Sequence, residues 1–160
     1  MERIIIIGNS GSGKSTFAKK LSREKDIPHL DLDVFAFDST GLRKDINRSL
    51  NEISSFINEN HSWIIEGCYG DLLEKLSAHA TKLYFLNPGV DACANNNKKR
   101  PFEKHKYNSP EEQNENLNML QNWVKEYETR TDEYSYKKHK EIYNNFSGGK
   151  EEYTVLKEYM

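Results

Sequence analysis

The sequence predicts a single α/β domain in which a parallel β-sheet lies between two layers of helices. Short segments rich in β-branched and aromatic residues alternate with amphipathic segments along the chain, and short loops join them. This order is typical of parallel strands whose crossover helices cover both faces of the sheet. The length of 160 residues is that of one domain. A chain of this size buries about 70% of its unfolded surface, so a hydrophobic core alone can stabilise it.

Four strands and two helices are expected in the first part of the chain. The residue types of the four strand segments pack well on a pleated surface. These segments are Arg3–Ile7, Pro28–Leu32, Trp63–Glu66 and Lys82–Leu86. A first helix is expected over Lys14–Arg23, where Phe17, Ala18 and Leu21 share one face. A second helix of about three turns is predicted by the spacing i, i+4, i+7, i+11. Its apolar residues are Ile46, Leu50, Ile53 and Ile57.

The second part of the chain is expected to hold three helices and one strand. A helix is predicted over Val90–Lys99 and is followed by the polar, irregular stretch "RPFEKHKYNSPEEQ". A helix start is predicted within that stretch. Ser109 is expected to be the N-cap, with Pro110 at the first helical position and Glu112 closing a capping box. Further on, we expect a helix over Thr131–Phe146 and a last short strand over Tyr153–Leu156.

Charge and cysteine content exclude several classes of protein. The net charge is −2 at pH 7, which argues against a general nucleic-acid binder. The two cysteines, Cys68 and Cys93, are too few for a disulfide framework, so we expect reduced thiols. Cys68 has no neighbouring histidine or lysine to activate it and is interpreted as a small residue of a pocket wall. Four isoleucines are too short for a signal peptide core or a membrane span, so we expect a cytoplasmic protein.

The stretch "GNSGSGKST" carries the strongest functional signal of the chain. It satisfies the pattern G-x-x-x-x-G-K-[ST], between an expected strand and an expected helix. In such a loop, hereafter the phosphate loop, successive backbone N–H groups and the helix N-terminus surround an anion. The residues expected to bind the phosphates are Gly8, Asn9, Ser10, Gly11, Ser12, Gly13, Lys14, Ser15 and Thr16. The predicted ligand is a nucleoside triphosphate, with Mg²⁺·ATP expected.

Within this loop, Lys14 can reach the β- and γ-phosphates, and the Ser15 hydroxyl can ligate the bridging Mg²⁺. Carboxylates are expected nearby, because ligands of an open parallel sheet bind beyond the carboxyl ends of its strands. Strand alternation puts Asp31 and Asp33 on one side of the chain, where one could support Mg²⁺ and the other engage an acceptor hydroxyl. Glu66, which ends "WIIE", is a further candidate for the Mg²⁺ shell. Alternatively, these are solvated acids and an ordinary strand-to-turn transition.

A basic run, "KKRPFEKHK" at residues 98–106, supplies candidate transition-state cations. Phosphoryl transfer spreads negative charge over the γ-phosphate oxygens, which guanidinium groups stabilise. Arg100 within this run and Arg130 further on are the candidates, and a mobile loop could carry them over the phosphates. The alternatives are a solvated basic surface or a patch for nucleic acid; the second is disfavoured by the few aromatic residues and the acidic chain.

Together these residues resemble the adenylate kinase and shikimate kinase branch of P-loop phosphotransferases. "RIIIIGNSGSGKSTFAKKL" is similar to their opening strand, loop and helix, and "LDLD" resembles the D-x-D of shikimate kinases. "WIIEGCYG" resembles the strand ending in Asp-Gly of adenylate kinases, and "YETRTDEYSYKKHKEIY" the helix after their lid, with Arg130 as the matching arginine. The chain is also similar to small bacterial proteins labelled shikimate kinase-like or topology modulation protein. The resemblance implies a five-stranded parallel core and a lid near residues 100–115.

The residues expected to bind the phosphoryl acceptor differ from those of the kinases that the chain resembles. Adenylate kinases follow Asp-Gly with Phe-Pro-Arg, whose arginine binds the acceptor nucleotide, whereas Cys68-Tyr69-Gly70 follows here. Shikimate kinases have three consecutive glycines after the third strand, for which Gly67 and Gly70 are a partial substitute. Arg43 and Arg48 are the two candidates to replace a carboxylate-binding arginine of shikimate kinases.

The function predicted from these patterns is an ATP-dependent phosphotransferase acting on a hydroxyl or phosphate of a small molecule. Lys14, Asp33, Arg100 and Arg130 are the expected catalytic residues, and Ser15, Asp31 and Glu66 the expected metal-site residues. The expected partners are Mg²⁺, ATP and a small-molecule acceptor, with no membrane and no general nucleic-acid binding. Alternatives are a nucleotide-dependent switch acting on a protein or nucleic-acid partner, and an enzyme that phosphorylates nucleic-acid ends.

Overall fold

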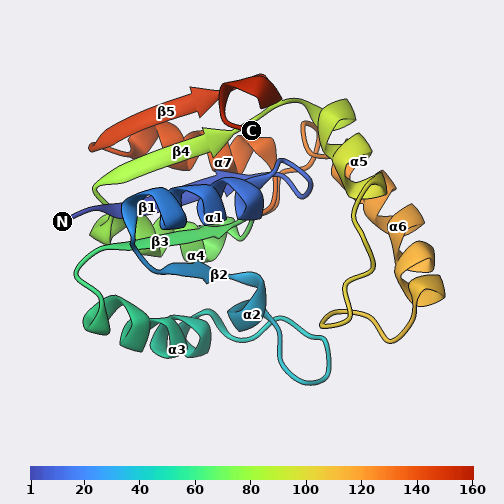
Figure 1. Cartoon of the computed structure of the whole chain (residues 1–160), viewed down its shortest axis with the longest axis horizontal. Coiled ribbons are helices and arrows are strands. Elements are labelled where there is room, and N and C mark those ends of the chain that lie inside the picture. Colours follow the sequence, from blue (N-terminus) through green and yellow to red (C-terminus); the bar gives the residue numbers. More distant parts are fainter.

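The computed structural model describes residues 1–160 as a five-stranded parallel sheet in the order β2-β3-β1-β4-β5 (Figure 1). The strands are β1 (Arg3–Gly8), β2 (His29–Asp31), β3 (Trp63–Gly67), β4 (Lys82–Leu86) and β5 (Gly149–Tyr153). The helices are α1 (Lys14–Lys25), α2 (Asp33–Ala36), α3 (Ile46–Glu59), α4 (Gly70–Leu76), α5 (Val90–Lys98), α6 (Pro110–Lys125) and α7 (Tyr136–Asn145). Two 3₁₀ turns, Ser77–His79 and Leu156–Glu158, complete the chain. The expected α/β fold with a five-stranded parallel sheet is confirmed.

Two apolar clusters on opposite faces of the sheet make three layers. Ile5 and Ile7 of β1 belong to the larger cluster, to which α3, α4 and α7 contribute. Ile4 and Ile6 belong to the second cluster, with side chains from α1 and Tyr159. All four isoleucines are at most 1% exposed, because successive side chains of a strand point to opposite faces and helices cover both of these. The run of β-branched residues is therefore the central strand of the domain.

Several elements differ from the sequence-based expectations, and three of them are the last strand and two short helices. The last strand was expected over Tyr153–Leu156, but β5 covers Gly149–Tyr153, so that prediction is wrong. β5 pairs only with β4 and is an edge strand, so the charged sequence "GKEEY" is tolerated there although it lacks an apolar pattern. The short helices α2 and α4 were not predicted, since each directly follows a strand and resembles a turn in sequence.

Capping residues set the starts of the two helices that follow the irregular stretch. Ser109 Oγ accepts a hydrogen bond from the Glu112 backbone N–H at 3.1 Å, as expected for an N-cap. The Glu112 carboxylate accepts from the N–H of Asn108 rather than of Ser109, so the reciprocal bond lies one residue earlier than expected. α7 begins at Tyr136 instead of Thr131 because Ser135 is its N-cap and accepts from the Lys138 N–H at 3.1 Å.

The segment between α5 and α6 extends away from the sheet and passes close to α2 before α6 begins (Figure 1). It has no regular secondary structure up to Ser109, and α6 covers the rest of the range in which a lid was expected. We refer to residues 99–109 as the lid segment. No helix of the structure has the length and apolar character needed to cross a bilayer.

A buried histidine joins α7 to the end of β3. His139 is fully buried, with Nε2 2.8 Å from the Cys68 carbonyl oxygen and Nδ1 2.6 Å from the Tyr127 hydroxyl oxygen. Because a carbonyl can only accept, Nε2 donates its proton to Cys68 and Nδ1 accepts from Tyr127. Burial lowers the pKa of His139 to about 3, so the imidazole is neutral in the folded protein.

We predict that His139 makes stability depend on pH between 7 and 5. An unfolded histidine has a pKa of about 6.5, so below that value the unfolded chain binds a proton that the folded protein excludes. Stability is therefore expected to fall as pH drops from 7 to 5, by up to about 1.4 kcal/mol per pH unit. Urea unfolding at pH 7, 6 and 5 checks this. His139→Gln should reduce the slope, and His79→Gln, at an exposed position, should leave it unchanged. Equal slopes in all three proteins would contradict the assignment.

The phosphate loop packs tightly against α5, which gives a second prediction. Gly11 has a positive φ of 82°, and a Cβ added there would overlap the Cys93 carbonyl oxygen. Gly41 has nearly the same φ, 83°, with no heavy atom within 4 Å of an added Cβ. Both alanine variants incur the cost of a left-handed conformation, about 1–2 kcal/mol. Only Gly11→Ala adds overpacking, so it should lose about 1–3 kcal/mol more in urea unfolding. Equal losses of stability in the two variants would mean that the phosphate loop can move away from α5 at little cost.

Candidate active site

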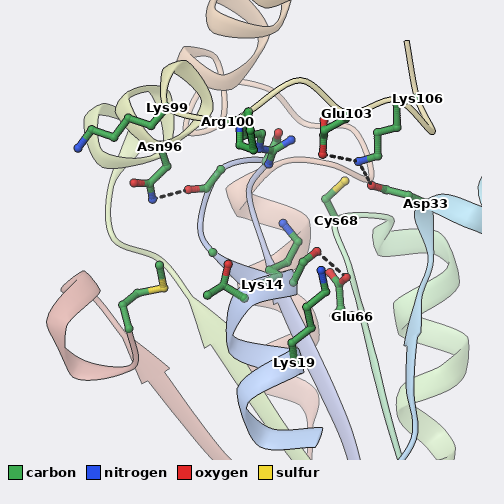
Figure 2. Close-up of a pocket in the computed structure, with 17 residues that line it drawn as sticks. Lys14, Lys19, Asp33, Glu66, Cys68, Asn96, Lys99, Arg100, Glu103 and Lys106 are labelled. Atoms are coloured by element: carbon green, nitrogen blue, oxygen red, sulfur yellow. Dashed lines mark hydrogen bonds and ion pairs between the residues drawn. The ribbon is translucent and has the colours of Figure 1, made fainter. Parts of the chain in front are cut away.

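A cavity of about 510 Å³ lies at the carboxyl end of the sheet. Its wall is formed by the phosphate loop and α1, by residues at the ends of β2 and β3, and by α5 with the lid segment (Figure 2). Six of the nine residues expected to bind phosphates line it directly: Ser10, Gly11, Gly13, Lys14, Ser15 and Thr16. Gly8, Asn9 and Ser12 belong to the same loop but lie behind this surface. Two of these three, Asn9 and Ser12, are at most 2% exposed.

The phosphate loop is held in shape by elements distant in sequence. Asn96 of α5 donates to the Gly11 carbonyl at 2.8 Å, and the Tyr159 hydroxyl donates to the Ser12 carbonyl at 2.6 Å. The Asn9 amide donates to the carbonyl of Val124 in α6 at 3.2 Å. These bonds occupy loop carbonyls and the Asn9 side chain, so the loop is shaped before any anion binds. Neither Asn96 nor Tyr159 was predicted from the sequence, because nothing in its local pattern marks a contact so far along the chain.

Lys14 lies inside this loop and is largely buried. Its side-chain nitrogen donates to the carbonyl oxygen of Asn9 at 2.7 Å. This contact keeps the ammonium group next to the space that the backbone N–H groups surround. A phosphate there would offer charged oxygens, with which a lysine forms stronger hydrogen bonds than with a carbonyl.

Ser15 and Glu66 connect the start of α1 to the end of β3. The Ser15 hydroxyl donates to Glu66 Oε1 at 2.8 Å, and both residues line the cavity. Glu66 is only 2% exposed, and His29 Nε2 lies 3.4 Å from the same carboxylate oxygen. His29 was not predicted as a site residue. It precedes Asp31 in the strand that pairs with β3, so its role depends on sheet register.

The oxygen atoms of Ser15 and Glu66 fit Mg²⁺, which prefers hard oxygen ligands and usually keeps several waters. The structure contains no cluster of three or more His, Cys, Asp or Glu side chains arranged to hold a metal ion. The Ser15 hydroxyl and the Glu66 carboxylate would therefore hold Mg²⁺ together with phosphate oxygens of a bound nucleotide.

Asp31 and Asp33 lie in different environments, contrary to the alternation expected for one strand. β2 ends at Asp31, and Asp33 already begins α2, so the two side chains do not repeat along a strand. Asp31 Oδ1 accepts from the Asp33 backbone N–H at 2.9 Å, and Asp31 does not line the cavity. Burial, together with the charges of Glu66 and Asp33, raises the pKa of Asp31 to about 6. Asp33 and Glu66 thus line the cavity, whereas Asp31 does not.

Asp33 lines the cavity and has two polar partners. The Tyr69 hydroxyl donates to Asp33 Oδ1 at 2.6 Å, and Lys106 Nζ of the lid segment lies 3.4 Å from Oδ2 (Figure 2). Although burial alone would raise the pKa of Asp33, the Tyr69 hydrogen bond and the charges of Lys106 and Lys14 lower it below its ordinary value. The carboxylate is therefore ionised at neutral pH. Tyr69 has no sequence signal as a site residue; its contact arises only because α4 follows β3 immediately.

Part of the basic run lines the cavity. Lys99, Arg100 and Lys106 contribute to the wall, whereas Lys98, Lys104 and His105 do not. The helix α1 adds Lys19, one turn beyond Ser15. Lys19 was missed from the sequence, although its i, i+4 spacing from Ser15 puts it on the same helix face.

Arg130 is placed elsewhere. It does not line the cavity; its guanidinium stacks on Trp123 at 4.1 Å and bonds to the carbonyl oxygens of Trp123 and Tyr134. It also pairs with Asp132 at 3.3 Å. The structure therefore gives Arg130 a packing role between α6 and α7. The sequence match at this position could not show that the N–H groups of Arg130 already bind these carbonyl and carboxylate oxygens.

Cys68 lines the cavity, in agreement with its interpretation as a wall residue. Burial raises the pKa of its thiol to about 12, so the thiol is protonated at neutral pH and is not a nucleophile. Met160 also lines the cavity, and a Cβ added to Gly13 would lie 2.9 Å from its sulfur.

Comparison with known proteins agrees with this fold. A scan against models of protein families gives no match. Over 96 residues, 60% of this chain, the sequence is 34% identical to a shikimate kinase of Flavobacterium johnsoniae, and the chain spans about half (51%) of that protein's length.

Two solved structures share the fold. A gluconokinase from Sinorhizobium meliloti 1021 has a TM-score of 0.52 at 14% identity, covering 99% of this chain and 86% of its own. A sugar kinase from Janibacter sp. HTCC2649 has a TM-score of 0.55 at 12% identity, covering 98% and 86%. The resemblance to a shikimate kinase is confirmed over the matched part of the chain, and the two solved structures confirm the fold.

We predict that Ser15→Ala weakens nucleotide binding only when Mg²⁺ is present. The variant removes the hydroxyl suited to the metal but leaves the backbone N–H groups of the loop intact. Titration calorimetry with ATP, in Mg²⁺ and then in EDTA, should show at least a tenfold loss in the first condition and little in the second. Ser54→Ala, on α3 and away from the cavity, is the matched control. An equal loss in both conditions would show instead that Ser15 supports the loop itself.

Proposed function

We propose that the protein transfers the γ-phosphoryl group of Mg²⁺·ATP to a hydroxyl or phosphate of a small molecule. The observation that carries this proposal is that an ionised Asp33 and the phosphate loop with Lys14 line the same cavity. A nucleotide switch needs the loop but has no need of a second carboxylate positioned for an acceptor. Transfer needs both, because donor and acceptor must meet in one enclosed space.

In the proposed reaction, an acceptor oxygen attacks the γ-phosphorus while the bond to the β,γ-bridging oxygen breaks and ADP leaves. The proton of an acceptor hydroxyl passes to the carboxylate of Asp33, which must first exchange its contact with Lys106 for one with the acceptor. Lys14 and Arg100 oppose the charge that develops on the transferring group. When bound, Mg²⁺ would neutralise phosphate charge, next to Ser15 and Glu66.

The lid segment supports the same proposal. Its cations line the cavity, and an ion pair between Lys106 and Asp33 links it to the opposite wall. A segment held across the opening by one exposed ion pair can move aside cheaply, since such pairs contribute little. Closure over bound substrates would exclude water, which favours transfer over hydrolysis.

The relatives support a kinase, and each is named for a small-molecule acceptor class. The sequence relative is a shikimate kinase, and the two structures of shared fold are a gluconokinase and a sugar kinase. Because this chain spans only half of the shikimate kinase, we take from these proteins the reaction class and leave their individual substrates aside.

The proposal predicts acceptor-stimulated turnover that depends on Lys14 and Asp33. Phosphorus NMR of Mg²⁺·ATP with nucleoside monophosphates, shikimate, gluconate, nucleosides and short oligonucleotides should yield one new phosphoester or phosphoanhydride signal. Lys14→Ala and Asp33→Asn should each lower kcat/KM by a factor of about 10²–10³, the loss typical of removing one transition-state contact. Lys20→Ala, on an exposed face of α1, should retain activity.

Binding of ATP without stimulated turnover by any small molecule would reject the kinase. Stimulation by oligonucleotides alone would indicate an enzyme acting on nucleic-acid ends, and stimulation by a protein a nucleotide switch.

A further inference from the structure

The carboxylate of Asp33 is bound by a tyrosine that does not itself line the cavity. The Tyr69 hydroxyl donates to Asp33 Oδ1 at 2.6 Å, and Tyr69 is only 4% exposed. The other oxygen, Oδ2, lies 3.4 Å from Nζ of Lys106, a partly exposed lysine of the lid segment (Figure 2). The two carboxylate oxygens are therefore not equivalent. Oδ1 is bound to a buried residue, whereas Oδ2 faces a cation on a segment that can move aside.

The backbone at Tyr69 is fixed by the turn from β3 into α4. The Tyr69 carbonyl accepts from the Leu73 N–H at 2.9 Å, and the Gly70 N–H donates to the carbonyl of Glu133 at 2.9 Å. A Cβ added to Gly70 would overlap that same carbonyl oxygen, so glycine is required for this close approach. The backbone of Tyr69 therefore cannot shift without disturbing the contact between α4 and the segment before α7.

The ring of Tyr69 is packed among three side chains. Phe37 and Tyr134 meet it edge to face, with ring centres 6.0 and 5.6 Å away, and the Arg43 guanidinium lies 4.9 Å from its centre. Arg43 is itself held by Asp71, whose carboxylate oxygens it contacts at 2.9 and 3.2 Å. Such a bidentate pair is directional. A ring enclosed in this way has little freedom to rotate, so its hydroxyl stays in one place.

Both arginines considered as substitutes for a carboxylate-binding residue lie outside the cavity wall. Neither Arg43 nor Arg48 lines the cavity. Arg48 lies 3.5 Å from Glu52 on the same helix, and Arg43 packs on the ring that holds Asp33. Arg43 thus contributes to the site by packing against Tyr69 and has no contact with the space open to a ligand.

The orientation of Asp33 matters for proton transfer, because the accepting oxygen must lie within hydrogen-bond reach of the acceptor hydroxyl. An unrestrained aspartate side chain rotates about two bonds, and only some of its orientations would direct an oxygen into the cavity. The bond to Tyr69 uses Oδ1 and leaves Oδ2 free to exchange its partner. An acceptor hydroxyl that replaces Lys106 would therefore meet an oxygen that is already in position.

From these contacts we propose that Tyr69 is a positioning residue for phosphoryl transfer: it binds Oδ1 of Asp33 and so presents Oδ2 to the acceptor hydroxyl. The inference rests on the proposed phosphotransfer and adds the residue that orients its base. In the transfer step, the acceptor oxygen bonds to the γ-phosphorus while the bond from phosphorus to the bridging oxygen breaks, and the hydroxyl proton passes to Oδ2. Tyr69 keeps its own proton and touches neither substrate.

Tyr69→Phe tests this role because it removes the hydroxyl and keeps the packed ring. The assay uses Mg²⁺·ATP and the compound of the acceptor panel above that gives a new phosphorus signal. We expect kcat to fall about tenfold, because the reacting oxygen is misplaced, while KM for ATP changes by less than about twofold. Tyr136→Phe is the matched control, since this tyrosine of α7 also packs against the core and does not line the cavity. It should keep the kcat of the parent protein.

A double-mutant cycle separates positioning of Asp33 from general support of the fold. If Tyr69 acts through Asp33, adding Tyr69→Phe to Asp33→Asn should change kcat by less than about twofold, because the carboxylate to be oriented is already lost. Titration calorimetry should give the same affinity for ATP in all variants, which also shows that they are folded. Losses in kcat that multiply, or a loss of ATP affinity as large as the fall in kcat, would overturn the inference and give Tyr69 a structural role.

The role of Tyr69 and the proposed kinase activity fail in different ways. If the parent protein phosphorylates an acceptor and Tyr69→Phe is as active as Tyr136→Phe, the role of Tyr69 is overturned and the kinase remains. If the parent protein binds ATP but phosphorylates no compound of the panel, the kinase is rejected and the role of Tyr69 with it.

Discussion

Hydrogen bonding of β1 between β3 and β4 fixes the position of everything in the site. The register pairs Ile7 with Gly67 on one side and with Phe85 on the other, so the phosphate loop leaves the sheet between the ends of its two neighbours. Glu66 therefore lies beside the first turn of α1, where Ser15 can bond to it. A shift of one residue would exchange the faces of all four isoleucines and expose apolar surface in both layers, which makes the register strongly determined.

The parts of the structure that depend on local pattern were predictable, and those that depend on distant contacts were not. The phosphate loop needs glycine at positions such as Gly11, whose backbone approaches α5. The spacing of these glycines is visible in the sequence. The Ser109 cap is likewise a local signal. In contrast, the roles of Tyr69, Asn96 and Lys106 arise from residues brought together by folding. The role proposed for Arg130 has the opposite difficulty. The sequence around it resembles that of other kinases, but in the structure its guanidinium stacks on Trp123 and pairs with Asp132.

The two sides of the cavity are built from different parts of the fold. On the loop side, the backbone N–H groups and Lys14 provide the environment that a triphosphate needs. On the other side, the Asp33 carboxylate pairs with Lys106, and the charges of Lys106 and Lys14 lower its pKa. This contrast explains why a fold shared with several kinases gives little information about the second substrate. The loop is common to the fold, while the opposite wall is formed by α2, α4 and the lid segment.

The hydrogen bond from Tyr159 to Ser12 spans 147 residues and has a consequence for synthesis of the chain. A ribosome adds about 5–20 residues per second, so the loop emerges roughly 7–30 s before the side chain that completes its support. During that interval Ser12 lacks this partner, and β4 lacks its outer neighbour β5. The nascent chain is thus expected to gain affinity for nucleotide late and abruptly, once the edge strand and the turn after it have docked.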